Sequence, residues 1–249
     1  MRKSVYLILG ASSDLGLALI ERLNAETEAD ENRIFIAHYH SSSDRLKAIP
    51  IKAQNALFCV CADFSNPESI ENFIAEVKAI NPCPSHIVHL AAEPFRYMKL
   101  KEFQREVLLR AVDVQLCAFL RIAREFLPEM AKRKQHDKII IITSYVVNRP
   151  PKFMLDYIVA KYALLGAMKS LAADYEGKMV NINAVSPSMI ETKFLKNIDS
   201  RIVELTAEKS PEGRNASTED IVGVIDFLLS NSANYIHGQN IAVDNGAGI

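Results

Sequence analysis

The feature that most constrains the fold is the alternation of short apolar runs with longer amphipathic stretches along the 249 residues. A short apolar run is typical of a strand buried on both faces, and an amphipathic stretch is typical of a helix that covers such strands. Seven runs predict strands near residues 5–9, 34–37, 56–60, 87–90, 139–143, 180–184 and 241–243. Repeated strand-helix units predict a doubly wound α/β fold, in which about seven parallel strands have helices on both faces.

The segments between the strands predict five helices and one long irregular excursion. Helices are expected near residues 15–25, 67–79, 100–133, 156–175 and 218–230. The acidic segment 26–32 has no periodicity and predicts a solvated loop. The polar segment 189–215 with scattered apolar residues predicts a lid over an active site. No repeat or linker divides the chain, so we expect a single domain over residues 1–249.

The composition restricts the classes of binding partner that we expect. The 29 basic and 30 acidic residues nearly balance, which argues against nucleic acid and favours a small-molecule partner. No apolar stretch approaches the roughly 20 residues of a membrane helix, so we expect no membrane association and a cytoplasmic location. The four cysteines (Cys59, Cys61, Cys83, Cys117) lack the paired spacings of a zinc site, and no metal is expected.

A turn rich in small residues joins the first predicted strand to the first predicted helix. Free N–H groups and the helix dipole at such a junction favour a pyrophosphate. A carboxylate at Asp14 would repel that group if it pointed inward, so we expect it to point out from the first helical turn. The predicted phosphate-binding residues are Gly10, Ser12, Ser13, Asp14, Leu15 and Gly16.

Tyr157 and Lys161 lie four residues apart in a predicted helix, so both side chains emerge on one face. A neighbouring ammonium favours the phenolate and brings a tyrosine of pKa near ~10 towards use in proton transfer. Ser144, at the end of the preceding strand, is placed to hydrogen-bond a substrate carbonyl oxygen. By itself the Tyr-x-x-x-Lys pattern also fits an ordinary pair on a helix surface.

Ser144 thirteen residues before Tyr157, Lys161 four residues later and a phosphate-type loop at the start resemble the short-chain dehydrogenase/reductase family in combination and order. The resemblance spans essentially the whole chain and includes segments 183–187 and 238–244. It implies a Rossmann-type sheet, with the cofactor bound by about residues 1–150 and the substrate and lid in about 150–249. It also implies a homo-oligomer, either a dimer or a tetramer.

The resemblance assigns roles residue by residue. Tyr157 is expected to act as the general acid in carbonyl reduction, Lys161 to tune it and hold the nicotinamide ribose, and Ser144 to position the substrate oxygen. Gln115 stands where the family often has a catalytic asparagine. Further expected cofactor contacts are Asp63, Phe64, Ala91, Ala92, Pro187, Ile190 and Thr192. An alternative for Asp63 is a turn aspartate before the next helix.

The end of the second predicted strand bears on the choice of dinucleotide. An NAD-specific site usually has an acidic residue there, to bind the ribose hydroxyls. Tyr39 takes that place, and His40 and Ser41 can donate hydrogen bonds to a 2′-phosphate. We therefore expect NADP(H), with NAD(H) as the alternative. The histidine-rich run also fits an exposed strand end.

The sequence thus predicts an NADP(H)-dependent oxidoreductase that resembles the 3-oxoacyl-[acyl-carrier-protein] reductase branch. The expected reaction is reduction of a ketone or 3-oxoacyl thioester, free or carrier-linked, to the alcohol. A sugar or polyol dehydrogenase of the same family fits the same residues. The departures at Asp14, at His89 with Leu90 and at Gln115 motivate another alternative, a dinucleotide-binding sensor or scaffold without turnover.

Overall fold

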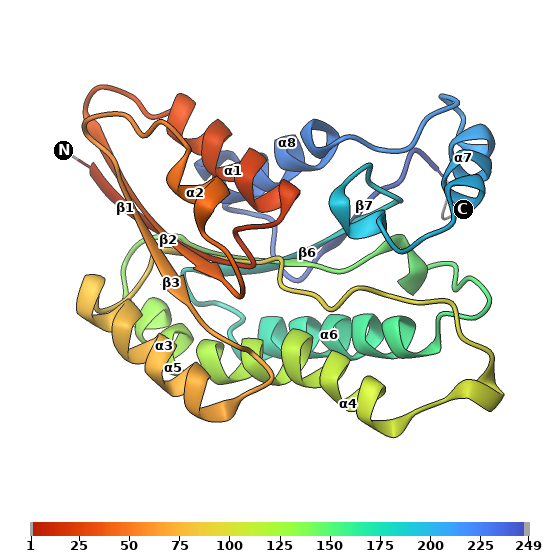
Figure 1. Cartoon of the computed structure of the whole chain (residues 1–249). Helices are drawn as coiled ribbons and strands as arrows, with labels where there is room; N and C mark the ends of the chain where they lie inside the picture. The colour runs from red at the N-terminus through yellow and green to blue at the C-terminus, as the bar shows by residue number, and fades with distance from the viewer. Residues whose placement is uncertain (1, 247–249) are drawn as a thin grey trace.

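The computed structural model describes residues 2–246 and contains a seven-stranded parallel sheet between two layers of helices (Figure 1). The strands are β1 (Arg2–Leu9), β2 (Glu31–Tyr39), β3 (Ala56–Cys61), β4 (His86–His89), β5 (Asp137–Ile142), β6 (Val180–Pro187) and β7 (Asn240–Val243). Their order across the sheet is β3-β2-β1-β4-β5-β6-β7, and every neighbouring pair is parallel. The predicted doubly wound α/β fold is confirmed.

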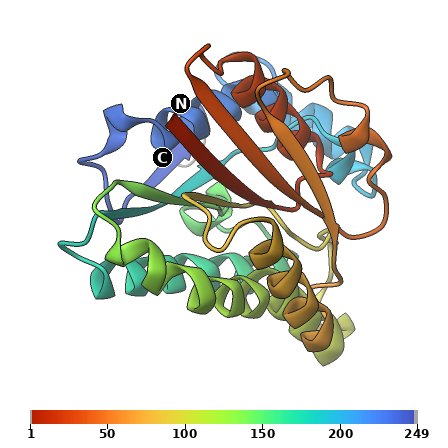
Figure 2. The same ribbon diagram turned by 90° about the vertical axis from the view of Figure 1, so that its left-hand side faces the viewer.

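The two layers follow from the alternation of side chains along buried strands. In β1, Leu7 and Leu9 belong to one core cluster, and Tyr6 and Ile8 belong to the other. The first cluster lies against α3 (Pro67–Ile80), α5 (Ala118–Lys132) and α6 (Leu155–Asp174). The second lies against α1 (Asp14–Ala25) and α8 (Thr218–Leu229). Figure 2 shows these helices on opposite sides of the strands.

The strand order creates one crevice at the carboxyl edge of the sheet. The chain leaves β1 on one side to form β2 and β3, and later returns to the other side of β1 with β4. The loops after β1 and β4 therefore turn in opposite directions, which opens space between them. This topological switch point positions the site described below.

The long helix expected over residues 100–133 is interrupted in the structure. A 3₁₀ turn (Leu100–Glu102) precedes α4 (Arg105–Val112), a π-helical turn (Asp113–Cys117) follows, and α5 then completes the segment. In the π turn, Ala118 N–H donates to the carbonyl of Asp113, one residue further back than in an α-helix. The Gln115 carbonyl there accepts a hydrogen bond from the His89 ring at 2.7 Å, a tertiary contact that periodicity does not reveal.

Two other segments are more ordered than expected. Strand β2 already begins at Glu31, inside the segment interpreted as a loop. The lid segment contains a 3₁₀ turn (Lys193–Leu195) and helix α7 (Ser200–Lys209). The remaining short helical pieces are α2 (Asp44–Lys47) and 3₁₀ turns at Tyr145–Val147 and Asn231–Ala233. Within residues 2–246, no helix combines the length and apolar character needed to cross a membrane.

Candidate active site

The loop between β1 and α1 is tight because two glycines leave no room for a side chain. Gly10 has φ +82°, and a Cβ there would lie 2.7 Å from the backbone nitrogen of Ala91. A Cβ on Gly16 would lie 2.5 Å from the carbonyl oxygen of Ala11. Ser13 caps α1: its Oγ accepts from Gly16 N–H at 3.1 Å and donates to Gly10 O at 2.8 Å. The sequence therefore specifies a fixed turn at a helix N-terminus.

His38 hydrogen-bonds the backbone of this loop, and we did not predict it as a site residue from the sequence. Its Nδ1 accepts from Gly10 N–H at 2.9 Å, and its Nε2 lies 3.1 Å from Ala62 O, to which it donates. Burial lowers the pKa of His38 to about 4, so the ring is neutral and keeps the tautomer that both bonds require. The ring is 3 % exposed and stacks on Phe64 at 3.8 Å. His38 therefore does not belong to an exposed strand end.

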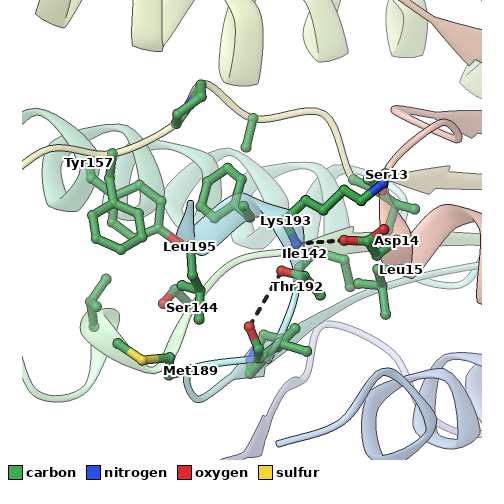
Figure 3. Close-up of a pocket in the computed structure, with 18 of the residues that line it drawn as sticks. Ser13, Asp14, Leu15, Ile142, Ser144, Tyr157, Met189, Thr192, Lys193 and Leu195 are labelled. Carbon is green, nitrogen blue, oxygen red and sulfur yellow. Dashed lines mark hydrogen bonds between the residues drawn. The ribbon is translucent and has the colours of Figure 1, made fainter. Parts of the chain in front are cut away.

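Asp14 connects the first helical turn to the lid and to α2. Its Oδ2 accepts from Lys193 N–H at 2.6 Å (Figure 3). Its Oδ1 lies 2.7 Å from the Arg45 guanidinium. Burial raises the pKa of Asp14, but these two partners outweigh it and the net pKa is lowered. The carboxylate thus points to the lid and α2, and it stays ionised because both partners stabilise the anion.

Ser144, Tyr157 and Lys161 meet at the carboxyl end of β5. Ser144 follows β5, and the other two lie on α6. The Ser144 side chain lies close enough to the Tyr157 phenol to favour its phenolate form. Lys161 Nζ lies 5.6 Å from the centre of the Tyr157 ring and donates to Ile142 O at 2.9 Å. The four-residue spacing on one helix brings phenol and ammonium to the same face, as predicted.

The pKa of Tyr157 shifts in the direction opposite to the one expected from the sequence. Burial raises the pKa of Tyr157 to about 12, although the neighbouring Ser144 side chain opposes this shift. Burial also lowers the pKa of Lys161 to about 7. The net pKa of Tyr157 is therefore raised rather than lowered, in contrast to the expectation from the neighbouring ammonium, because desolvation dominates for both groups. At neutral pH the phenol carries its proton and is a donor.

Gln115 is not among the residues that line the cavity. It is fully buried in the π turn, and neither polar atom of its side chain has a hydrogen-bond partner among the described residues. Its backbone oxygen accepts from His89 Nε2. Burial lowers the pKa of His89 to about 3, so that ring is neutral. The structure therefore gives Gln115 a backbone contact with His89 and no place among the residues that line the cavity.

A cavity of about 620 Å³ unites the phosphate loop with the Ser144, Tyr157 and Lys161 group (Figure 3). Twelve predicted site residues line it: Ser12, Ser13, Asp14, Leu15, Ser41, Ala92, Ser144, Tyr157, Lys161, Pro187, Ile190 and Thr192. The remaining predicted residues do not: Gly10, Gly16, Tyr39, His40, Asp63, Phe64, Ala91 and Gln115. Gly10, Gly16 and Ala91 instead form the packed base of the phosphate loop.

Asp63 and Phe64 have structural partners. Asp63 Oδ1 accepts from the N–H and hydroxyl of Ser65, and both bonds lower the pKa of Asp63. This is the turn geometry that was the alternative for Asp63. Phe64 packs in the core against His38.

Sequence reasoning missed several cavity residues. Arg45 reaches the cavity from α2, and the only sequence signal for it was a basic residue shortly after the second strand. Phe95 and Tyr97 reach it from the loop after β4, a segment that the sequence did not mark; Phe194, in contrast, lies in the segment predicted as the lid. Phe95 lies 5.1 Å from the Tyr157 ring, centre to centre. These aromatics follow no helix or strand periodicity that would have marked them.

A parallel sheet with a phosphate-type loop at its switch point, and a serine, tyrosine and lysine facing the same cavity, defines a Rossmann-type oxidoreductase. The family model described as enoyl-(acyl carrier protein) reductase matches residues 16–248. The chain belongs to the short-chain dehydrogenase/reductase family.

Individual relatives cover nearly the whole chain. It is 26% identical over 251 residues to dehydrogenase/reductase SDR family member 4 of Oryctolagus cuniculus, covering 99% of this chain and 94% of the relative. It is 27% identical over 244 residues to the 3-oxoacyl-[acyl-carrier-protein] reductase FabG of Rickettsia bellii, covering 96% and 95%. The solved structure of a levodione reductase superposes with a TM-score of 0.87 at 21% identity, covering 98% of this chain and 97% of the other, and supports the fold.

Proposed function

We propose that the chain is an NADP(H)-dependent reductase that converts a ketone or 3-oxoacyl thioester to the alcohol. The observation that carries the proposal is the cavity that joins the phosphate loop to a protonated Tyr157 phenol and the neighbouring Ser144 side chain. A phenol that keeps its proton at neutral pH is suited to donate it to a carbonyl oxygen. We assign cofactor contacts to about residues 1–150 and substrate contacts largely to residues 150–249.

The residues at the phosphate loop fit a dinucleotide. The two glycines at the turn exclude side chains from the α1 N-terminus, and the backbone N–H groups there suit a pyrophosphate. Arg45 lines the same cavity as Ser41, and Tyr39 provides no carboxylate to repel a 2′-phosphate. The Arg45 side chain is 49 % exposed, so its pairing with Asp14 is weak enough for a phosphate dianion to compete. The bound dinucleotide would supply the hydride.

The chain's own residues handle the proton. Tyr157 donates its phenolic proton to the substrate oxygen, while the Ser144 hydroxyl hydrogen-bonds that oxygen and shares its developing charge. The positive form of Lys161 beside the ring stabilises the phenolate that remains. With the pKa of Lys161 at about 7, both of its protonation states are populated at neutral pH.

The test is a fluorescence titration with NADPH and NADH, followed by assays of cofactor oxidation with ketones and 3-oxoacyl thioesters. Tight NADPH binding is expected, with turnover that falls by roughly 10²-fold or more in Tyr157→Phe, since a general acid contributes about that much. Retained NADPH binding in Tyr157→Phe separates lost chemistry from lost folding. Binding without turnover of any substrate would move the assignment to a sensor, and absence of binding would contradict the phosphate-loop argument.

We also propose a homo-oligomer built through α6. Its outer face exposes Leu155, Val159 and Tyr162, which are spaced four and three residues apart and form one apolar stripe. Light scattering during gel filtration should give a dimer or tetramer mass, which Val159→Glu should reduce. A monomer at micromolar concentration would contradict this. The proposed location is the cytoplasm, where the four free cysteines would stay reduced.

A further inference from the structure

The cavity has two ends of different chemistry. Asp14 and Arg45 lie at the phosphate-loop end, and Figure 3 shows the Lys193 side chain extending towards Ser13 on that side. Side chains from three segments line the other part, here called the aromatic end: Phe95, Tyr97, Tyr145, Met154, Phe194 and Leu195. None of these six carries a charge at neutral pH. The reacting pair, Ser144 and Tyr157, lines the same cavity, and Tyr157 adjoins the aromatic end through Phe95.

Phe95 is the centre of the aromatic end. Its ring lies 5.1 Å from the Tyr157 ring, tilted by 44°, and 5.7 Å from the Phe194 ring, tilted by 51°. The Tyr97 ring meets Phe95 edge-on at 6.2 Å. One side chain thus joins the proton donor, the lid and the loop after β4. Such spacings and tilts are those that aromatic rings prefer, and a further ring can extend the arrangement.

Polar ligands fit this end poorly. Among the six side chains that define this end, hydroxyl groups are present only on Tyr97 and Tyr145, and burial raises the pKa of both; the further cavity hydroxyls of Ser188 and Thr206 do not belong to these six. Two phenols cannot pair the several hydroxyls of a sugar, and each unpaired buried hydroxyl opposes binding. Lys196, the other lysine of this part of the lid, also lines the cavity but is exposed to solvent, which screens its charge.

We propose that the substrate is a hydrophobic ketone whose carbonyl adjoins an aromatic or alicyclic ring, with that ring held by Phe95 and Phe194. This inference rests on the proposed reductase function and adds the substrate class to it. The reacting oxygen meets Ser144 and Tyr157, and the ring takes the apolar space beside them. Phe95 is then a specificity-determining residue with no part in the proton transfer.

The experiment compares kcat/KM, with NADPH, for an aryl methyl ketone, butanone, an aldose and a 3-oxoacyl thioester. We expect kcat/KM for the aryl ketone to exceed kcat/KM for butanone by roughly 30-fold or more, since moving a ring from water into an apolar site is favourable by about that factor. Phe95→Ala should lower that ratio by roughly tenfold, because the aryl ketone loses its ring contact and butanone has no ring to lose. Phe58→Ala is the control, because Phe58 is a phenylalanine outside the cavity, 41 % exposed, whereas Phe95 is half-buried inside it.

A binding measurement separates this inference from the proposed function. If no substrate turns over, the reductase proposal fails, and thermal shifts of the NADPH complex by ring ketones still report on the aromatic end. A shift that Phe95→Ala removes and Phe58→Ala retains supports the inference. A preference for the sugar or thioester, an aryl-to-butanone ratio unchanged in Phe95→Ala, or the absence of any shift and turnover with ring ketones overturns it.

Discussion

Lowering the pH should reduce the free energy of unfolding, because two buried histidines cannot readily take up protons in the folded protein. Burial lowers the pKa of His38 to about 4 and that of His89 to about 3, whereas both rings take up protons near pH 6.5 once unfolded. The unfolded chain therefore binds more protons below pH 6.5, and stability falls as pH falls from about 6.5 towards these values. His38 also holds Gly10, so protonation would release the phosphate loop.

The magnitude follows from linkage. Between pH 7 and pH 5 the two histidines together remove about 4 kcal/mol from the free energy of unfolding. Asp137 acts in the opposite sense: burial raises its pKa to about 6, so its protonation returns about 1 kcal/mol. The net loss of roughly 3 kcal/mol is a large fraction of a typical domain's stability.

Chemical unfolding at pH 7 and pH 5, at fixed protein concentration, measures this loss. His38→Asn keeps a side chain able to accept and donate, but it removes one titrating group, so the loss should shrink by about 2 kcal/mol. Equal stability of the wild type at the two pH values would refute the reasoning. So would a loss that is the same in wild type and His38→Asn.

Three further predictions concern the phosphate loop and its neighbours. Gly10→Ala should lower the free energy of unfolding by about 2–4 kcal/mol, because φ +82° and a contact at 2.7 Å both oppose a Cβ; thermal unfolding should register it, and an unchanged midpoint contradicts it. Arg45→Ala should weaken NADPH binding by roughly tenfold or more and leave the affinity for NADH nearly unchanged. Lys47→Ala, in the same helix but outside the cavity, should change neither affinity. Equal losses of affinity for the two dinucleotides would exclude a 2′-phosphate contact. Asp14→Ala should speed tryptic cleavage after Lys193 roughly tenfold, because it removes the bond that holds the lid. Asp14→Asn can still accept from Lys193 N–H and should have a smaller effect. Identical digestion of the wild type and both variants would show that Asp14 does not hold the lid.

The sequence by itself determined the sheet and the reacting group. Strands buried on both faces must be continuously apolar, so a run such as Ile139 to Ile142 can be recognised as a strand from the sequence alone. The turn from Gly10 to Gly16 and the four-residue spacing of Tyr157 and Lys161 are likewise local patterns, because a turn or one helical rotation fixes their geometry. The structure confirms the parallel α/β sheet and brings these segments to one cavity.

Only the tertiary structure decided the features that depend on contacts between distant segments. His38 holds Gly10 across 28 positions, and His89 meets the carbonyl of Gln115 in the π turn across 26 positions. The shifts in pKa at Tyr157 and Lys161 reflect burial, a property of the packed molecule that overrides the attraction expected between neighbours on a helix. Phe95 likewise reaches Tyr157 and the lid from a loop. Local periodicity reports which face of an element is apolar, whereas such contacts are set by how the elements pack against one another.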